Sequence, residues 1–107
     1  MEKVHEFDLW QALAEHAGKP FVTSGRPGRP GIEFTYTIRG NEMFVSTKVK
    51  SITKATVLIA YRQAIEIQAS EGYVRGPKKI GCFGSSYLYA IFIRLGICTP
   101  IPTDLLG

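Results

Sequence analysis

Alternating apolar and polar positions in residues 31–50 predict an antiparallel β-hairpin. Apolar side chains occupy every second position from Ile32 to Ile38, with polar ones between them. This period of two is typical of a strand with one buried face. Gly40 and Asn41 then form a two-residue turn signal, because both tolerate positive φ at low cost.

That turn sets the register of the hairpin. Arg39 should lie opposite Glu42, and the pairing continues back along both strands. The predicted pairs on the apolar face are Ile38–Met43, Tyr36–Val45, Phe34–Thr47 and Ile32–Val49, and on the polar face they are Thr37–Phe44, Thr35–Ser46 and Glu33–Lys48. A slip by one residue would mix the two faces, so the hydrophobic pattern specifies the register.

Apolar residues at helical spacing predict three helices. The first covers residues 4–17 and includes Trp10 on its buried face. The second covers residues 53–68 with Ser51 as its N-cap. The predicted buried residues of the second helix are Val57, Ala60, Tyr61, Ala64 and Ile67. The last helix covers residues 87–95, with Ser85 or Ser86 as its N-cap.

These elements predict a single α+β domain of 107 residues. An N-terminal helix and an antiparallel hairpin are followed by two helices packed on the apolar face of the small sheet, since a lone hairpin is only marginally stable. A short strand is also predicted at residues 21–23. No apolar run is long enough for a membrane span, and the acidic start is unlike a signal peptide, so we expect a cytoplasmic protein.

The positive charge is concentrated in the middle of the chain. The net charge is −3 over residues 1–18, +6 over residues 19–62 and +1 over residues 63–107, for a total of +4. A basic middle region favours a polyanionic partner.

Residues 24–31 (SGRPGRPG) contain two tandem Gly-Arg-Pro units. Proline excludes a helix or a central strand here. The segment is either a stiff extended connector or a basic arm whose Arg26 and Arg29 lie in a DNA minor groove. The Gly-Arg-Pro units resemble the core of an AT-hook. The resemblance covers only these few residues, because Ser24 and Gly31 stand where flanking basic residues are expected.

The polar face of the hairpin combines cations, hydroxyl groups and one outward ring. Its members include Arg39, Phe44, Ser46, Lys48 and Lys50. Nucleic-acid surfaces use cations and hydroxyls for phosphates and rings for stacking. The alternative is that a helix covers this face and makes Phe44 part of the core.

A glycine-rich loop before the last helix carries a second basic group, Lys78 and Lys79. A helix start can bind phosphate, although a capped structural loop explains the same residues. The nucleotide-binding P-loop pattern fails, because Cys82 stands where its lysine is required. The nearby lysines and helix start would lower the pKa of Cys82 and make it reactive, whereas a buried, inert thiol is the alternative. Cys82 and Cys98 are expected to be free thiols.

No catalytic or metal-binding constellation emerges. Ser51 and Lys54 match the Ser-x-x-Lys pattern of serine acyl-enzymes, but a helix cap explains Ser51 with fewer assumptions. The histidines and cysteines lack metal-ligand spacing, and the acidic residues are scattered. We therefore expect a non-enzymatic protein without cofactor, metal or small-molecule ligand.

The leading hypothesis is a small basic protein that binds nucleic acid, with duplex DNA favoured and most contacts to the backbone. The predicted contact residues are Arg26, Arg29, Arg39, Phe44, Lys48, Lys50, Lys54, Lys78 and Lys79. The alternative is a protein-interaction module, acting as a regulator or inhibitor, that docks through an exposed strand edge. The same edge would allow a homodimer.

Overall fold

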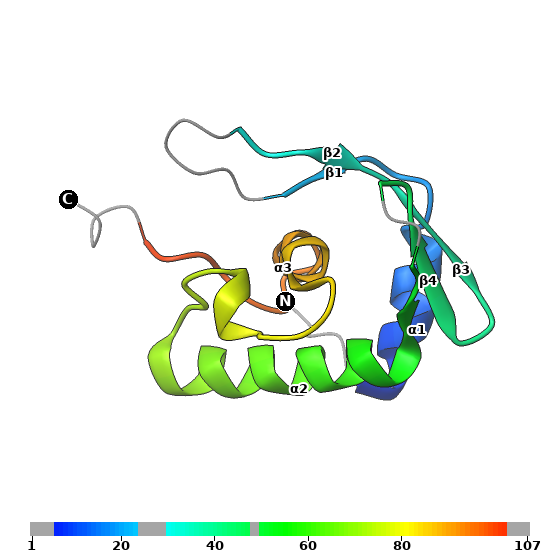
Figure 1. The fold of residues 1–107 in the computed structure, drawn as a ribbon. Coiled ribbons are helices and arrows are strands. Elements are labelled where there is room, and N and C mark those ends of the chain that lie inside the picture. The colour runs from blue at the N-terminus through cyan, green and yellow to red at the C-terminus, as the bar shows by residue number, and fades with distance from the viewer. Residues whose placement is uncertain (1–5, 24–29, 48–49, 103–107) are drawn as a thin grey trace.

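The computed structural model describes residues 6–23, 30–47 and 50–102. Its elements, in chain order, are α1 (Glu6–Glu15), β1 (Phe21–Val22), β2 (Glu33–Phe34), β3 (Tyr36–Arg39), β4 (Glu42–Val45), β5 (Ile52–Thr53), α2 (Lys54–Glu71), the 3-10 helix η1 (Pro77–Lys79) and α3 (Ser85–Arg94). In Figure 1, α3 is seen end-on between α2 and the β1–β2 pair, with the β3–β4 hairpin beside α1. The predicted α+β fold is confirmed.

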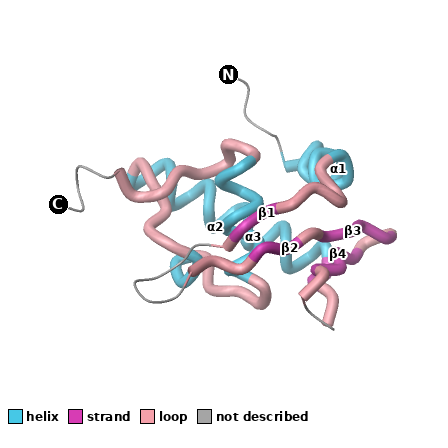
Figure 2. The backbone as a smooth tube through the Cα atoms, turned by 90° about the horizontal axis from the view of Figure 1, so that it is seen from above, coloured by secondary structure: helices cyan, strands magenta, loops and turns pink. Residues whose placement is uncertain are grey.

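The strands form two small antiparallel sheets, β1-β2 and β3-β4-β5. Figure 2 shows β1 and β2 following on from the β3–β4 hairpin, with β1 over the helices. The short strand predicted at residues 21–23 is confirmed as β1. Its Phe21 pairs with Phe34, while the β3–β4 ladder ends at Tyr36–Val45, so the predicted Phe34–Thr47 pair is wrong. The β3–β4 ladder ends before Thr35, because the Thr35 amide donates to the Ser46 hydroxyl at 3.0 Å instead of to a backbone carbonyl.

The register predicted around the turn is confirmed. The observed pairs are Arg39–Glu42, Ile38–Met43, Thr37–Phe44 and Tyr36–Val45. Gly40 has a φ of +57°, and Asn41 does not adopt positive φ. A type II′ turn has this pattern, since only its first central residue needs positive φ. The predicted partners Lys48 and Val49 lie outside the described residues.

Both predicted helix N-caps are wrong. Ile52 and Thr53 extend the sheet as β5, so the cap of α2 is Thr53, whose hydroxyl accepts from the Thr56 amide at 3.3 Å. Ser51 instead donates to Glu42 Oε1 at 2.6 Å. At α3 the N-cap is Gly84, with a φ of +76° and no side-chain cap hydrogen bond, so the helix begins at Ser85 itself.

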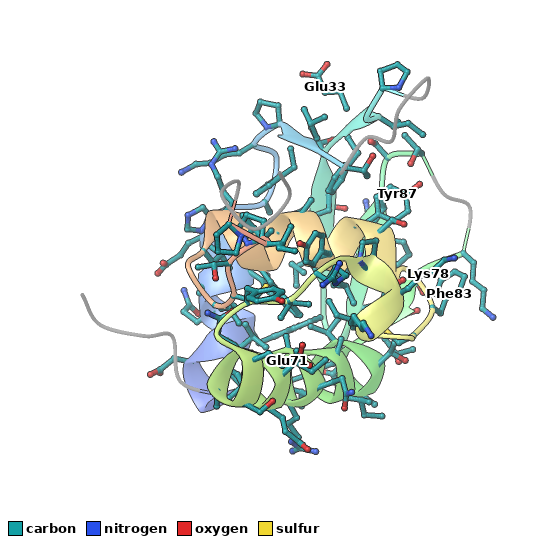
Figure 3. All side chains as sticks on the ribbon, turned by 90° about the vertical axis from the view of Figure 1, so that its left-hand side faces the viewer. Glu33, Glu71, Lys78, Phe83 and Tyr87 are labelled. Carbon is teal, nitrogen blue, oxygen red and sulfur yellow. The ribbon has the colours of Figure 1, made fainter. Side chains whose placement is uncertain are left out.

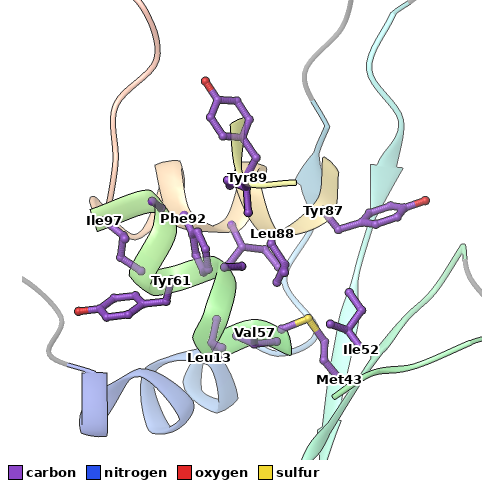
Figure 4. Packing of buried hydrophobic residues seen from close by; sticks show 14 of the residues in the cluster. Leu13, Met43, Ile52, Val57, Tyr61, Tyr87, Leu88, Tyr89, Phe92 and Ile97 are labelled. Carbon is purple, nitrogen blue, oxygen red and sulfur yellow. The ribbon is translucent and has the colours of Figure 1, made fainter. Parts of the chain in front are cut away.

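The core lies between the inner face of the β3-β4-β5 sheet, α2 and α3 (Figure 4). Its fully buried members include Tyr36, Met43, Ile52, Val57, Ala60, Ala64, Leu88, Ile91 and Phe92. Four of the five residues predicted to line the second helix are buried, and Ile67 is half-buried. Buried tyrosine hydroxyls find backbone partners: Tyr36 donates to the Leu13 carbonyl at 2.6 Å and Tyr89 to the Val74 carbonyl at 2.7 Å.

Candidate nucleic-acid interface

The outer face of the β3–β4 hairpin is exposed to solvent. Residues Thr37, Arg39 and Ser46 are exposed, and Phe44 keeps 37% of its surface accessible. Side chains alternate across a strand, so Phe44 points away from the buried Met43 and Val45. Because α2 and α3 pack on the inner face, the alternative in which a helix buries Phe44 is wrong. The Arg39 guanidinium carbon lies 5.9 Å from the centre of the Phe44 ring.

A second cation–aromatic pair lies at the start of α3. The Lys50 ammonium is 5.1 Å from the centre of the Phe83 ring, which is 43% exposed. Thr47 donates a hydrogen bond to the Tyr87 hydroxyl at 2.9 Å, so the chain leaving β4 is tied to α3. Figure 3 shows Phe83 and Tyr87 near the start of this helix.

Gly84 allows this close approach between α3 and the sheet. A Cβ atom built on Gly84 would overlap with the Cδ1 atom of Ile52 and lie 3.0 Å from its Cγ1 atom. The start of α3 therefore rests directly on the inner face of β5. Phe83, immediately before Gly84, is placed next to Lys50, immediately before Ser51 and β5.

A third cation, Lys54, lies at the hairpin turn. Its ammonium is 5.7 Å from the centre of the Trp10 ring, and its backbone amide donates to the Asn41 carbonyl at 2.7 Å. The Trp10 indole donates to the adjacent Gly40 carbonyl at 2.8 Å. Trp10 is half-buried and packs against the edge of the core. A shallow groove of about 480 Å³ runs beside this turn, lined by Asn41, Glu42, Thr53, Lys54, Ala55 and Leu58.

The predicted cations that the structure describes are not neutralised by described carboxylates. Across residues 6–23, 30–47 and 50–102, no acidic side chain lies within ion-pairing distance of Arg39, Lys50, Lys54, Lys78 or Lys79. Arg39 faces Glu42 across the hairpin, but the Glu42 carboxylate accepts from Ser51 instead.

The predicted contact residues that the structure describes fall into two groups. Arg39, Phe44 and Lys54 lie at the turn end of the hairpin. Lys50 lies beside the start of α3, and the exposed Lys78 and Lys79 lie on η1, which packs against α3. Arg26, Arg29 and Lys48 lie outside the described residues.

Phe83 was not among the contact residues predicted from the sequence. The available signal was its position between Cys82 and Gly84, in a loop where a large apolar residue has no helical or strand partner to share a buried face. Arg94 also lies near a ring, with its guanidinium carbon 5.3 Å from the centre of Phe21. That ring is only 2% exposed, so this pair is part of the packing.

The free edge of β3 is short. The Gly18 amide donates to the Tyr36 carbonyl at 2.9 Å, so the end of α1 covers one end of this edge. In the observed register Thr37 and Arg39 bond to β4, which leaves Ile38 as the residue of β3 whose backbone groups face outward without a partner in the described chain. β5 covers the other edge of β4. A partner strand that docks or dimerises through β3 would therefore find both backbone groups free only at Ile38.

Burial raises the pKa of both cysteine thiols. It raises the pKa of Cys82 above its ordinary value, outweighing an opposing backbone hydrogen bond. It raises the pKa of the buried Cys98 to about 11. Only the thiolate is a strong nucleophile, so the raised pKa runs against the interpretation in which basic neighbours activate Cys82 and favours the alternative of an inert thiol.

Within the part of the chain that the structure describes, no group of three or more histidine, cysteine or acidic side chains is placed to hold a metal ion. None of the described helices combines the length and apolar character needed to cross a membrane. Comparison of the chain with protein-family models, with curated proteins and with solved structures finds no match.

Proposed function

We propose that this protein is a non-enzymatic nucleic-acid-binding protein that contacts the sugar–phosphate backbone. One observation carries the proposal: the exposed cations Arg39 and Lys50 and the half-buried Lys54 stand beside aromatic rings instead of carboxylates. A cation in an ion pair with a carboxylate would have to break that pair before it could bind phosphate. These three cations have no such ion pair to break within the described chain. Exposed hydroxyls at Thr37 and Ser46 add donors of the kind that contact phosphate oxygens.

Phosphate contacts would come from both groups of cations. Arg39 and Lys54 supply the turn end of the hairpin, and Lys50 with the η1 lysines supplies the start of α3. The net charge of +4 adds long-range attraction for a polyanion. The preference for duplex DNA expected from the sequence depended on Arg26 and Arg29, which lie outside the described residues. Duplex DNA must therefore be compared directly with single-stranded DNA and RNA.

Salt-dependent binding tests the proposal. Fluorescence anisotropy should be measured with labelled duplex DNA, single-stranded DNA and RNA between about 50 and 200 mM salt. Each neutralised phosphate contributes a slope of about −0.9 in log K against log[salt] on B-DNA, and about −0.7 on a single strand. Absence of binding to all three at micromolar protein and low salt would overturn the proposal.

Two matched neutralisations locate the surface. Lys50→Gln should weaken binding and reduce the salt slope by about one phosphate contact. Arg94→Gln removes the same charge at the far end of α3, about 15 Å along the helix, and should leave the slope unchanged. Equal effects of the two substitutions would mean that the binding responds to net charge alone.

A further inference from the structure

We infer that the nucleic acid bound by this protein is single-stranded where it meets the protein, with unpaired bases stacking on Phe44 and Phe83. The inference rests on the proposed function and names the form of its ligand. It comes from the exposure of two rings, from the cation beside each ring, and from the position of the two rings on either face of the sheet near one edge strand.

The first step concerns exposure. Most large aromatic side chains of the described chain are buried, including Phe21, Phe34 and Phe92, each at 2% exposure or less. Phe44 and Phe83 are 37% and 43% exposed. Each therefore offers part of its surface to a planar ligand without any rearrangement of the core.

The second step concerns chemistry. Arg39 lies by Phe44 and Lys50 by Phe83, so each ring has a phosphate-binding cation within reach of the same nucleotide. Single-strand-binding surfaces combine these two groups, because every base has a π-face and every nucleotide has a phosphate. In a duplex the base faces are stacked on one another, and an exposed ring has nothing to stack on without intercalation.

The third step concerns geometry. Phe44 points from the outer face of β4, the strand whose Glu42 and Met43 pair with Thr53 and Ile52 of β5. Phe83 precedes Gly84, which rests on the inner face through Ile52. The two rings therefore lie on opposite faces of the sheet, Phe44 on β4 next to the edge strand β5 and Phe83 beside the inner face of β5. A flexible single strand can pass around this edge, whereas a duplex stays straight over roughly 150 base pairs unless bending is driven.

Three probes, each titrated over about 50–200 mM salt, test the inference: a labelled single strand of mixed sequence, its duplex, and a single strand with abasic sites throughout. The native protein should bind the mixed strand more tightly than either of the others. Phe44→Leu and Phe83→Leu should each lose about fivefold or more on the mixed strand, with an unchanged salt slope. Both substitutions should leave binding to the abasic strand unchanged.

Ring-retaining and remote variants complete the design. Phe44→Tyr and Phe83→Tyr should keep native affinity, because the π-face remains. Ile59→Ala removes a side chain that is 60% exposed on α2 and should have no effect. Urea unfolding of each variant separates loss of binding from loss of folding.

The outcomes distinguish the two proposals. Tighter binding to the duplex, or Leu variants that bind the mixed strand like the native protein, would overturn the stacking inference while backbone binding stands. Salt-independent or absent binding to all three probes would overturn the proposed function, and the inference with it.

Discussion

Gly84 provides the sharpest test of how α3 is positioned on the sheet. Gly84→Ala makes two changes: it places a side chain at a φ of +76°, and it pushes a methyl group into Ile52. Gly96 also has a φ of +76°, but an added Cβ there would meet nothing within 4 Å. Gly96→Ala is therefore a control for the backbone cost alone.

The magnitudes follow from these two differences. A left-handed conformation costs a non-glycine residue about 1–2 kcal/mol, which both variants incur. Overpacking a well-filled core adds about 1–3 kcal/mol, which only Gly84→Ala incurs. We expect losses in the free energy of unfolding of about 1–2 kcal/mol for Gly96→Ala and about 2–5 kcal/mol for Gly84→Ala.

A double-mutant cycle identifies the clashing atom. Ile52→Val removes Cδ1, the atom that the new methyl group would overlap. On its own it should cost about 0.5–1.5 kcal/mol. In the Ile52→Val background, Gly84→Ala should cost less than in the native protein, with a coupling of about 1–2 kcal/mol.

Urea unfolding, monitored by far-ultraviolet circular dichroism and by the fluorescence of the single tryptophan, measures the stability of all five proteins: the native protein, the three single variants and the double variant. The midpoint should shift while the slope with urea stays constant, as expected when only stability changes. Equal losses for Gly84→Ala and Gly96→Ala, or strict additivity with Ile52→Val, would refute the close contact between α3 and β5.

Three further predictions concern the core and the β1–β2 pair. Tyr36→Phe removes the 2.6 Å bond to the buried Leu13 carbonyl and should cost about 1–3 kcal/mol in urea unfolding; an unchanged midpoint would contradict that bond. Burial holds the pKa of Cys98 at about 11 against an ordinary 9.0, so the unfolded chain loses its proton first. Stability should be fully present below about pH 9 and fall by about 3 kcal/mol towards pH 11, and Cys98→Ala should show a smaller alkaline loss than the native protein. Gly31→Ala places a methyl group on the Thr23 carbonyl. This clash should weaken the neighbouring bond from the Thr23 amide to the Ile32 carbonyl at 3.0 Å and speed hydrogen exchange of that amide. Gly76→Ala places its methyl group in open space and should leave the exchange unchanged.

The hairpin register was predictable because a strong local signal determined it. Gly40-Asn41 set the turn, and alternation then assigned every neighbouring side chain to a face. The buried side of α2 followed from the same kind of pattern at helical spacing. These features depend on residues close together in the chain, and local rules describe such contacts well.

The departures came from contacts between distant segments. Ser51 looked like a helix cap because the pairing of Ile52 with Met43 across the sheet has no local signal. The division of the long strand at Thr35 depended on Phe21, thirteen residues before Phe34 in the printed sequence and its partner in β1. At the candidate interface, residue types indicated the cations, but the exposure of Phe83 depended on where α3 meets β5.

The hairpin turn gives the fold a built-in reporter. Both of its carbonyls are occupied from outside the hairpin, Gly40 by the Trp10 indole and Asn41 by the Lys54 amide. The sole indole of the chain thus sits at a junction where segments before and after the hairpin meet. Its emission monitors whether this three-way junction is assembled, so ligand binding at the turn and loosening of α1 can both be followed without an added label.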